Sequence, residues 1–207
     1  MPGGDSVLYT IGHSNHSAET FAGLLKSHGI TALADVRSSP YSQYCPQFSR
    51  EALSEHLWSL GIEYVFLGKE LGARPEVPEG YVDGRVDFRV VASTDLFKAG
   101  LKRLRTGMQK HRVAIMCAER DPLTCHRTIL VCRHFKRISP DIRHILADGS
   151  TEEHREAELR LVRLFGIEPT LFQPERTLDD MIDEAYDRQS LKIAYQPEES
   201  IEEHVET

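Results

Sequence analysis

The most informative segment of this chain reads Ala114-Ile115-Met116-Cys117-Ala118-Glu119-Arg120-Asp121-Pro122-Leu123-Thr124-Cys125-His126-Arg127. Its first part is a short apolar run, which is typical of a strand buried on both faces of a sheet. Its last part predicts the start of a helix, because Thr124 can act as an N-cap and neither proline nor glycine follows until Pro140. Thiols, a carboxylate, an imidazole and a guanidinium lie in this loop, so we expect the functional site there.

The rest of the chain repeats this alternation of apolar runs and helical segments. Short apolar runs predict strands at residues 7–11, 32–37, 62–67, 111–117 and 143–146. The spacing of apolar residues predicts helices at residues 17–28, 49–60, 94–109, 127–136 and 150–165. This order predicts an α/β fold, with three α/β/α layers around a mostly parallel sheet of about five strands.

Right-handed crossovers would bring all the strand-to-helix loops to one edge of such a sheet, where ligands bind. That edge would carry His13 and Ser14, Asp35 and Arg37, and the loop from Cys117 to Arg127. Residues 68–90 are rich in glycine, proline and charge, and we interpret them as a long loop that folds over the site.

The chain divides by composition into two parts. Residues 1–166 form the predicted α/β domain, and residues 167–207 form an acidic C-terminal extension that we expect to be partly helical or disordered. A short helix is predicted at residues 178–191, and disorder from Pro197 onward.

The composition is that of a soluble globular protein: 207 residues, of which 40% are hydrophobic and 28% charged. No apolar run is long enough to span a membrane and no signal peptide is visible, so we expect a cytoplasmic protein without a membrane partner. The four cysteines are then expected to be thiols or ligands, not disulfides. The net charge of −7 argues against a broad basic face, so a nucleic acid would bind only at a local site.

Five short motifs occur in a characteristic order along the chain. They are Thr10-Ile11-Gly12-His13-Ser14, Asp35-Val36-Arg37 with Pro40, Leu71-Gly72-Ala73-Arg74, Met116-Cys117-Ala118-Glu119 and Cys125-His126-Arg127. In this combination the chain resembles the family catalogued as domain of unknown function 488 (DUF488), over residues 7–149. The resemblance implies an α/β fold with a shared pocket and brings no established reaction. Ala73 departs from the pattern, since a second glycine is expected there, and its methyl group would stiffen the loop.

Cys125 is the candidate nucleophile. It would lie at a helix N-terminus beside His126 and Arg127, and both features stabilise a thiolate. The alternative is a partly buried thiol that only packs. The same helix start would hold a phosphate or carboxylate, which Arg37 and Arg127 could bind in bidentate fashion. Alternatively, Arg37 pairs with Asp35 or Glu119 and holds the loops together.

The carboxylates and His13 have several open roles. Asp35 and Glu119 fall at predicted strand ends, where they could act as acid and base or only fix the loops. His13 could be a base, a ligand contact or a helix cap, and the preceding Gly12 indicates a close approach of the backbone to a ligand. We therefore predict a catalytic set and a substrate-binding set: Cys125, His13, Asp35 and Glu119 for the first, and Ser14, Arg37, Arg74, His126 and Arg127 for the second.

Cofactor motifs are weak. Cys117, Cys125 and His126 could bind zinc or iron, but their spacing matches no common zinc module and we expect no metal or other cofactor. No Gly-x-Gly-x-x-Gly or Walker sequence follows a strand. The Cys-x5-Arg pattern of tyrosine phosphatases is excluded, because Leu123 and Val131 stand where the arginine would be.

The sequence therefore predicts an enzyme of hydrolase or transferase type that acts on an anionic, phosphate-bearing ligand such as a nucleotide or a nucleic-acid fragment. Two alternatives stay open. One is a regulatory module that binds such an anion without turnover, and the other is a metal or redox protein built on the thiols.

Overall fold

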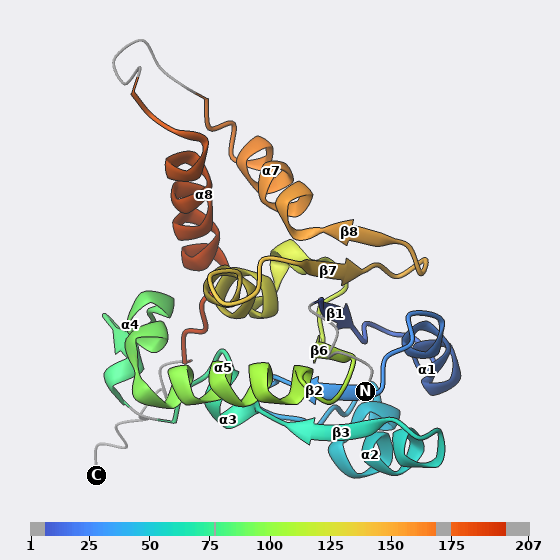
Figure 1. Ribbon diagram of the computed structural model, residues 1–207. Coiled ribbons are helices and arrows are strands. Elements are labelled where there is room, and N and C mark those ends of the chain that lie inside the picture. The colour runs from blue at the N-terminus through green and yellow to red at the C-terminus, as the bar shows by residue number, and fades with distance from the viewer. Residues whose placement is uncertain (1–6, 77, 169–174, 198–207) are drawn as a thin grey trace, which may run out of the picture.

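The computed structural model describes residues 7–76, 78–168 and 175–197, and within them a six-stranded sheet forms the centre of the molecule (Figure 1). The strand order is β3-β2-β6-β1-β7-β8. The strands are β1 (Leu8–Gly12), β2 (Ala32–Asp35), β3 (Glu63–Phe66), β6 (Val113–Cys117), β7 (Ile142–Ile145) and β8 (Thr151–Glu153). All neighbours in the sheet are parallel except β7 and β8, which pair antiparallel.

Helices cover both faces of this sheet. They are α1 (Ala18–Ser27), α2 (Arg50–Ser59), α3 (Gly68–Leu71), α4 (Phe88–Ser93), α5 (Asp95–Met108), α6 (Arg133–Phe135), α7 (His154–Leu164) and α8 (Leu178–Ile193). The predicted three-layer α/β/α fold is confirmed, because α1 and α2 pack on one face while α5 to α8 pack on the other.

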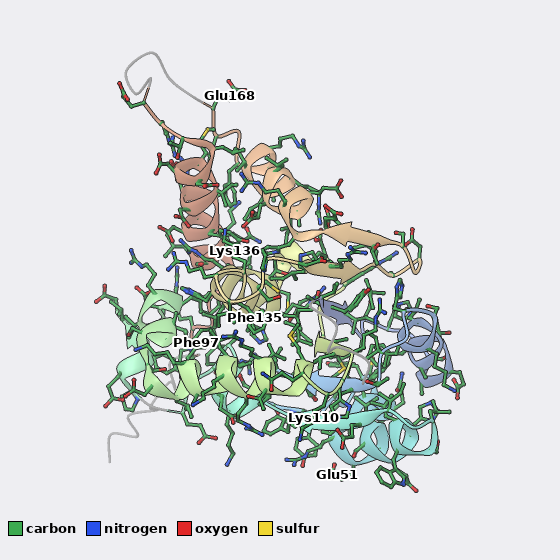
Figure 2. The ribbon with its side chains drawn as sticks, in the orientation of Figure 1. Glu51, Phe97, Lys110, Phe135, Lys136 and Glu168 are labelled. Atoms are coloured by element: carbon green, nitrogen blue, oxygen red, sulfur yellow. The ribbon has the colours of Figure 1, made fainter. Side chains whose placement is uncertain are left out.

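The two cores follow from the alternation of side chains along buried strands. In β6, Ala114 and Met116 join the core beneath α1 and α2, and Ile115 and Cys117 join the opposite core. Phe97 of α5 and Phe135 of α6 are fully buried in that second core (Figure 2). A short segment that is apolar on both faces is typical of a central strand, which is why the sequence located β6 correctly.

Three segments differ from the sequence-based prediction. The expected loop at residues 68–90 contains α3, the hairpin of β4 (Tyr81–Val82) and β5 (Arg85–Val86), and the start of α4. The helix expected from residue 150 is preceded by β8, since residues 146–150 form a turn that returns the chain to β7. The helix expected at residues 127–136 is a π-helix at Arg127–Cys132 followed by α6.

The predicted C-terminal extension contributes to the main core. Its helix, α8, packs against α7, and it buries Met181, Ile182, Ala185 and Tyr186 in the core that also contains β6. The physical reason is the apolar stripe of α8, which a solvated helix would expose. Of the residues expected to be disordered, 198–207 lie outside the described residues. In the part of the chain that the structure describes, no helix is long and apolar enough to cross a membrane.

A buried chain of hydrogen bonds links β1 to α8. Thr10 Oγ1 lies 2.8 Å from His144 Nδ1, and His144 Nε2 lies 3.1 Å from His154 Nδ1. His154 Nε2 lies 3.1 Å from the Tyr186 hydroxyl, which donates to Glu158. One orientation of protons satisfies every member, with each group donating to the next from Thr10 to Glu158.

We predict that acid weakens the fold through His154. Burial lowers the pKa of His154 from 6.5 to about 4; Glu158 opposes the shift, while Lys136 and Arg155 add to it. Between these two pH values the unfolded chain binds a proton that the folded imidazole does not. The free energy of unfolding should therefore fall by up to ~1.4 kcal/mol for each pH unit of acidification from this group.

Urea denaturation of the wild type and of His154→Phe, measured at about pH 7, 6 and 5, checks this prediction. The variant should be less stable at neutral pH, because His144 and Tyr186 lose a buried partner. Its stability should nevertheless depend less steeply on pH. Identical pH slopes in the two proteins would show that His154 does not control the acid response.

Candidate functional site

The loops that follow β1 and β6 are held together by the backbone. The amide of His13 donates to the Cys117 carbonyl at 2.9 Å, and the amide of Ser14 donates to the Ala118 carbonyl at 2.8 Å. These bonds extend the ladder beyond the strands to the C-terminal edge of the sheet. In the strand order, the connection after β1 leads toward β2 on one side of the sheet, and the connection after β6 leads toward β7 on the other side. Such a switch point between neighbouring strands is where α/β sheets bind ligands.

Gly12 allows these loops to approach. A Cβ atom at Gly12 would lie 1.9 Å from the carbonyl oxygen of Glu119, which no side chain permits. The glycine was expected to make room for a ligand, but the close approach is to the backbone of the cysteine loop. Ser14 follows in a left-handed conformation, with φ of 49°, and turns the chain toward α1.

Asp35 and Arg37 form a buried ion pair at the end of β2. The guanidinium donates to the Asp35 carboxylate at 2.6 Å from Nη2 and at 3.0 Å from Nε, and it also donates to the Phe48 carbonyl. Tyr64 donates its hydroxyl to the same carboxylate at 2.7 Å. This is the loop-holding role that the sequence left open for Arg37.

His13 is locked beside this pair. Its Nδ1 lies 2.8 Å from the Ser14 carbonyl and must donate to it, so Nε2 accepts from Arg37 Nη1 at 3.3 Å. The ring stacks on Phe48, with centroids 4.3 Å apart. Burial, together with the charge of Arg37, lowers the pKa of His13 to about 4 against the opposing effect of the hydrogen bond to Ser14. A neutral imidazole whose nitrogens are both engaged is a positioning group for Arg37.

Cys117, Cys125 and His126 converge in the interior. His126 Nδ1 lies 3.5 Å from Cys117 Sγ and 3.9 Å from Cys125 Sγ, and the three ligand atoms all lie within 4.8 Å of one another. On its other side, His126 Nε2 donates to the Val36 carbonyl at 2.9 Å. That bond directs Nδ1 at the two sulfur atoms. Burial lowers the pKa of His126, but the hydrogen bond and the charge of Cys125 outweigh it and raise this pKa.

The pKa values of the two thiols are shifted in opposite directions. Burial alone would raise the pKa of Cys125, but a hydrogen bond from Cys117 and the charges of Arg127 and His126 hold it well below its usual range. Burial and the neighbouring Cys125 raise the pKa of Cys117. The expected low pKa of Cys125 therefore has a cause other than a helix N-terminus, namely the second thiol and the nearby cations.

Arg127 is not placed to bind a ligand. Its side chain is fully buried, and its guanidinium donates to the Glu119 carbonyl at 2.7 Å and to the Arg120 carbonyl at 3.2 Å. Its amide donates to Cys125 Sγ at 3.4 Å. We expected Arg127 to hold an anion, but the inward turn of its side chain makes it the clamp of the cysteine loop.

A pocket of about 380 Å³ opens beside this cluster, and we call it the Cys117 pocket. Arg37, Arg74, Cys117, Glu119 and His126 line it together with Ser38, Ser39, Tyr41, Ala73, Ala118, Thr124, Ile193 and Tyr195. Of the predicted site residues it thus unites Arg37, Arg74, Glu119 and His126. The others (His13, Ser14, Asp35, Cys125 and Arg127) lie at the same edge of the sheet, outside its lining.

The end of α8 and the residues after it supply part of the lining that sequence reasoning missed. Ile193 and Tyr195 line the Cys117 pocket, and the Arg74 guanidinium stacks on the Tyr195 ring at 4.1 Å. The Tyr195 carbonyl accepts from the Val86 amide of β5, which fixes this segment in place. No local pattern places a residue so distant in sequence at the edge of the sheet.

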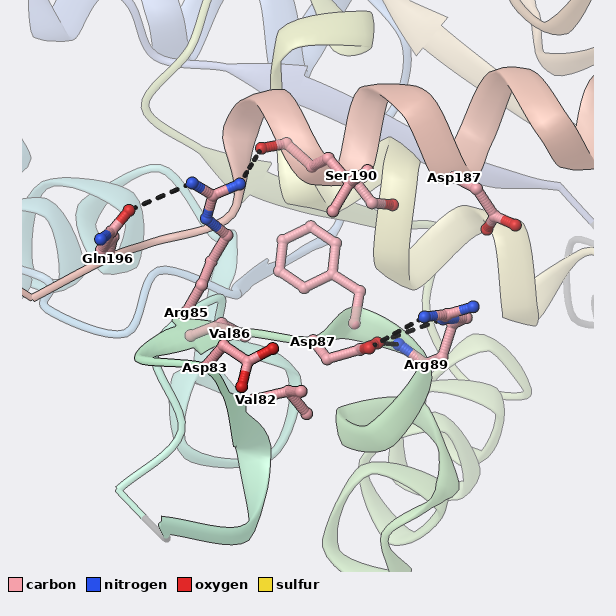
Figure 3. Close-up of a pocket in the computed structure, with 11 residues that line it drawn as sticks. Val82, Asp83, Arg85, Val86, Asp87, Arg89, Asp187, Ser190 and Gln196 are labelled. Atoms are coloured by element: carbon pink, nitrogen blue, oxygen red, sulfur yellow. Dashed lines mark hydrogen bonds and ion pairs between the residues drawn. The ribbon is translucent and has the colours of Figure 1, made fainter.

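A second pocket, of about 440 Å³, lies between α8 and the β4–β5 hairpin (Figure 3). Its arginines already have partners: Arg89 binds Asp87, while Arg85 donates to the Leu191 carbonyl and to Gln196. No cysteine or histidine among the described residues lines it. We therefore place the candidate site in the Cys117 pocket.

The fold and the site define a three-layer α/β protein with a thiol-lined pocket at the carboxyl edge of its sheet. The family model of the domain of unknown function DUF488 matches residues 17–133, and the chain belongs to that family. No curated protein and no solved structure matches the chain.

We predict that Gly12→Ala disrupts the cysteine loop. The added methyl group must displace the Glu119 carbonyl, to which the buried Arg127 guanidinium donates. The free energy of unfolding should drop by on the order of 2 kcal/mol or more. Urea denaturation measures the loss.

Gly23→Ala is the matched control for this substitution. Gly23 lies within α1, where an added Cβ meets nothing within 4 Å. Alanine is the better helix former, so the control should gain up to ~1 kcal/mol. Equal stability changes in the two variants would contradict the close approach at Gly12.

Proposed function

We propose that the protein is an enzyme that binds a small phosphate-bearing anion in the Cys117 pocket and acts on it there. One observation carries the proposal. Within the described part of the chain, the Arg74 guanidinium has no carboxylate partner, and it lies in the same pocket as Cys117, Glu119 and His126. A cation can hold an anion, and a carboxyl, a thiol and an imidazole beside it are candidates for proton transfer or nucleophilic attack.

Arg74 is the cation that selects for an anion. The charge of Arg37, the other arginine in the lining, is balanced by the Asp35 carboxylate at 2.6 Å. Hydroxyl groups of Ser38 and Ser39 line the same space and can donate to phosphate oxygens, whereas the Thr124 hydroxyl donates to the Asp121 carbonyl. The anion would therefore rest on one guanidinium and neutral hydroxyl donors, in agreement with a protein that has no net basic character.

The pocket suits a phosphate attached to a planar group. Its volume falls in the range of small-molecule sites, and Tyr41 and Tyr195 add aromatic surface to the lining. A nucleotide combines both parts, with the phosphate at Arg74 and the base against a tyrosine ring.

Glu119 is the candidate acid–base group. Its side chain lines the pocket, and its backbone is fixed by the bond from Arg127. In hydrolysis, a water oxygen forms a bond to phosphorus as the bond to the leaving oxygen breaks. Glu119 would take the proton of the attacking water and return it to the leaving oxygen.

We predict that Arg74→Gln weakens anion binding about 10-fold, since a charge-assisted contact contributes on the order of 1.5 kcal/mol. Titration calorimetry with inorganic phosphate and with adenosine monophosphate measures the change. Lys102→Gln is the control, because Lys102 is an exposed cation on α5 outside the Cys117 pocket. If both variants bind like the wild type, the pocket is not an anion site.

Turnover separates an enzyme from a binding module. We predict that the wild type hydrolyses at least one of adenosine monophosphate, p-nitrophenyl phosphate and bis(p-nitrophenyl) phosphate. Glu119→Gln should retain phosphate binding and lose roughly 100-fold or more of the rate. Binding of phosphate with no turnover of any of the three compounds would favour the non-catalytic module.

A further inference from the structure

We infer that Cys117, Cys125 and His126 form a binding site for a divalent metal ion of the zinc class. Among the described residues, no other group of three histidine, cysteine or acidic side chains brings its ligand atoms so close together. The three side chains are buried, come from two segments of the chain and meet at one point. This inference does not depend on the proposed function, because it concerns the ligands alone.

The distances fit tetrahedral coordination. Zinc bonds of ~2.3 Å to sulfur and ~2.1 Å to nitrogen, at tetrahedral angles, place sulfur and nitrogen ligands ~3.6 Å apart. The observed separations of His126 Nδ1 from the two sulfur atoms are 3.5 Å and 3.9 Å. Two sulfur ligands on such an ion would be ~3.8 Å apart, inside the 4.8 Å that bounds the cluster.

The hydrogen-bond partners of the proposed ligands are of the kind found in metal sites. A metal-bound histidine commonly donates its other ring N–H to a carbonyl or a carboxylate, and His126 Nε2 donates to the Val36 carbonyl. The bond directs Nδ1 at the sulfur atoms. Arg127 donates its amide to Cys125 Sγ, as backbone amides do toward metal-bound thiolates, and its guanidinium is tied to the carbonyls of the same loop.

Two thiolates, one imidazole and a divalent cation give a complex without net charge. Such a complex is tolerated in an apolar interior, where an isolated thiolate is costly. Sulfur and imidazole ligands favour zinc over magnesium or calcium, which prefer oxygen. Three protein ligands also leave a fourth position, as in catalytic zinc sites. Cys117 and His126 line the Cys117 pocket, so a water or ligand would reach that position from the pocket.

Metal binding to the reduced wild-type protein is the first test. The protein is loaded with zinc in the presence of a phosphine reductant, dialysed and analysed for metal by mass spectrometry. We expect one zinc per chain. Replacement by cobalt should give the intense visible bands of a tetrahedral ion and the near-ultraviolet bands of thiolate ligation. Substoichiometric zinc, or a cobalt spectrum without thiolate bands, would overturn the inference without reference to any variant.

Single substitutions then assign the ligands. Loss of a residue that only hydrogen-bonds to a metal ligand typically weakens metal binding ~10- to 100-fold. Cys117→Ser, Cys125→Ser and His126→Gln should each weaken zinc binding by more than this. Cys132→Ser is the matched control, because Cys132 is a buried cysteine at the end of the π-helix that follows His126 and is not part of the cluster. Equal zinc affinity in Cys125→Ser and the control, with wild-type circular dichroism in both, would also overturn the assignment.

Arg74→Gln distinguishes this inference from the proposed function. The variant should bind one zinc with the wild-type cobalt spectrum and bind phosphate more weakly. If the protein binds zinc but the Arg74 substitution does not change phosphate binding, the metal site stands and the anion pocket is rejected. If phosphate binding depends on Arg74 but no stoichiometric metal binds, the anion pocket stands and the metal site is rejected.

Discussion

The buried guanidinium of Arg127 holds the candidate site together. It donates to two consecutive carbonyls of the loop after β6, at Glu119 and Arg120, while its own amide donates to Cys125 Sγ. One residue thus connects both ends of the loop that carries the thiols. A buried charge is costly unless it is well bonded, so displacement of the loop would leave the guanidinium without its acceptors. The absence of a side chain at Gly12 is part of the same arrangement, because it lets the Glu119 carbonyl lie against β1.

A second network fixes the neighbouring loop and faces the first across the edge of the sheet. The Asp35–Arg37 pair, with Tyr64, His13 and the Phe48 carbonyl, satisfies the charged groups at the end of β2. The residue between the two, Val36, offers its carbonyl to His126. The ion pair and the thiol cluster are therefore coupled through one short stretch of backbone. The predicted catalytic groups His13 and Asp35 are part of this scaffold, and Cys117, Glu119, His126 and Arg74 are the candidate residues that line the pocket.

The C-terminal helix completes both the core and the pocket. Tyr186 of α8 belongs to the buried chain of hydrogen bonds that runs from Thr10 to Glu158, and the Tyr195 ring stacks on the Arg74 guanidinium. The helix thereby connects the interior of the sheet to the rim of the site. This explains why an acidic segment that looks peripheral in composition has fully buried side chains.

The sequence alone predicted the parallel strands and the edge of the sheet at which the candidate groups lie. The alternation of apolar runs and helices is a local pattern, and right-handed crossovers then determine how the strands are arranged. It also identified Cys117, Cys125 and His126 as a ligand set to consider, but it did not show how close together the three side chains lie. The tertiary structure alone decided which way each side chain turns. Cys125 is buried in the turn before His126, and Arg127 turns inward to donate to the carbonyls of Glu119 and Arg120. Arg127 also begins a π-helix, in which each hydrogen bond spans one more residue than in the α-helix that the sequence predicts. Tyr195 reaches the pocket only because the apolar stripe of α8 packs on a core far from it in sequence. Such long-range packing leaves no periodic signal in the chain, so the final composition of the site could not be predicted from it.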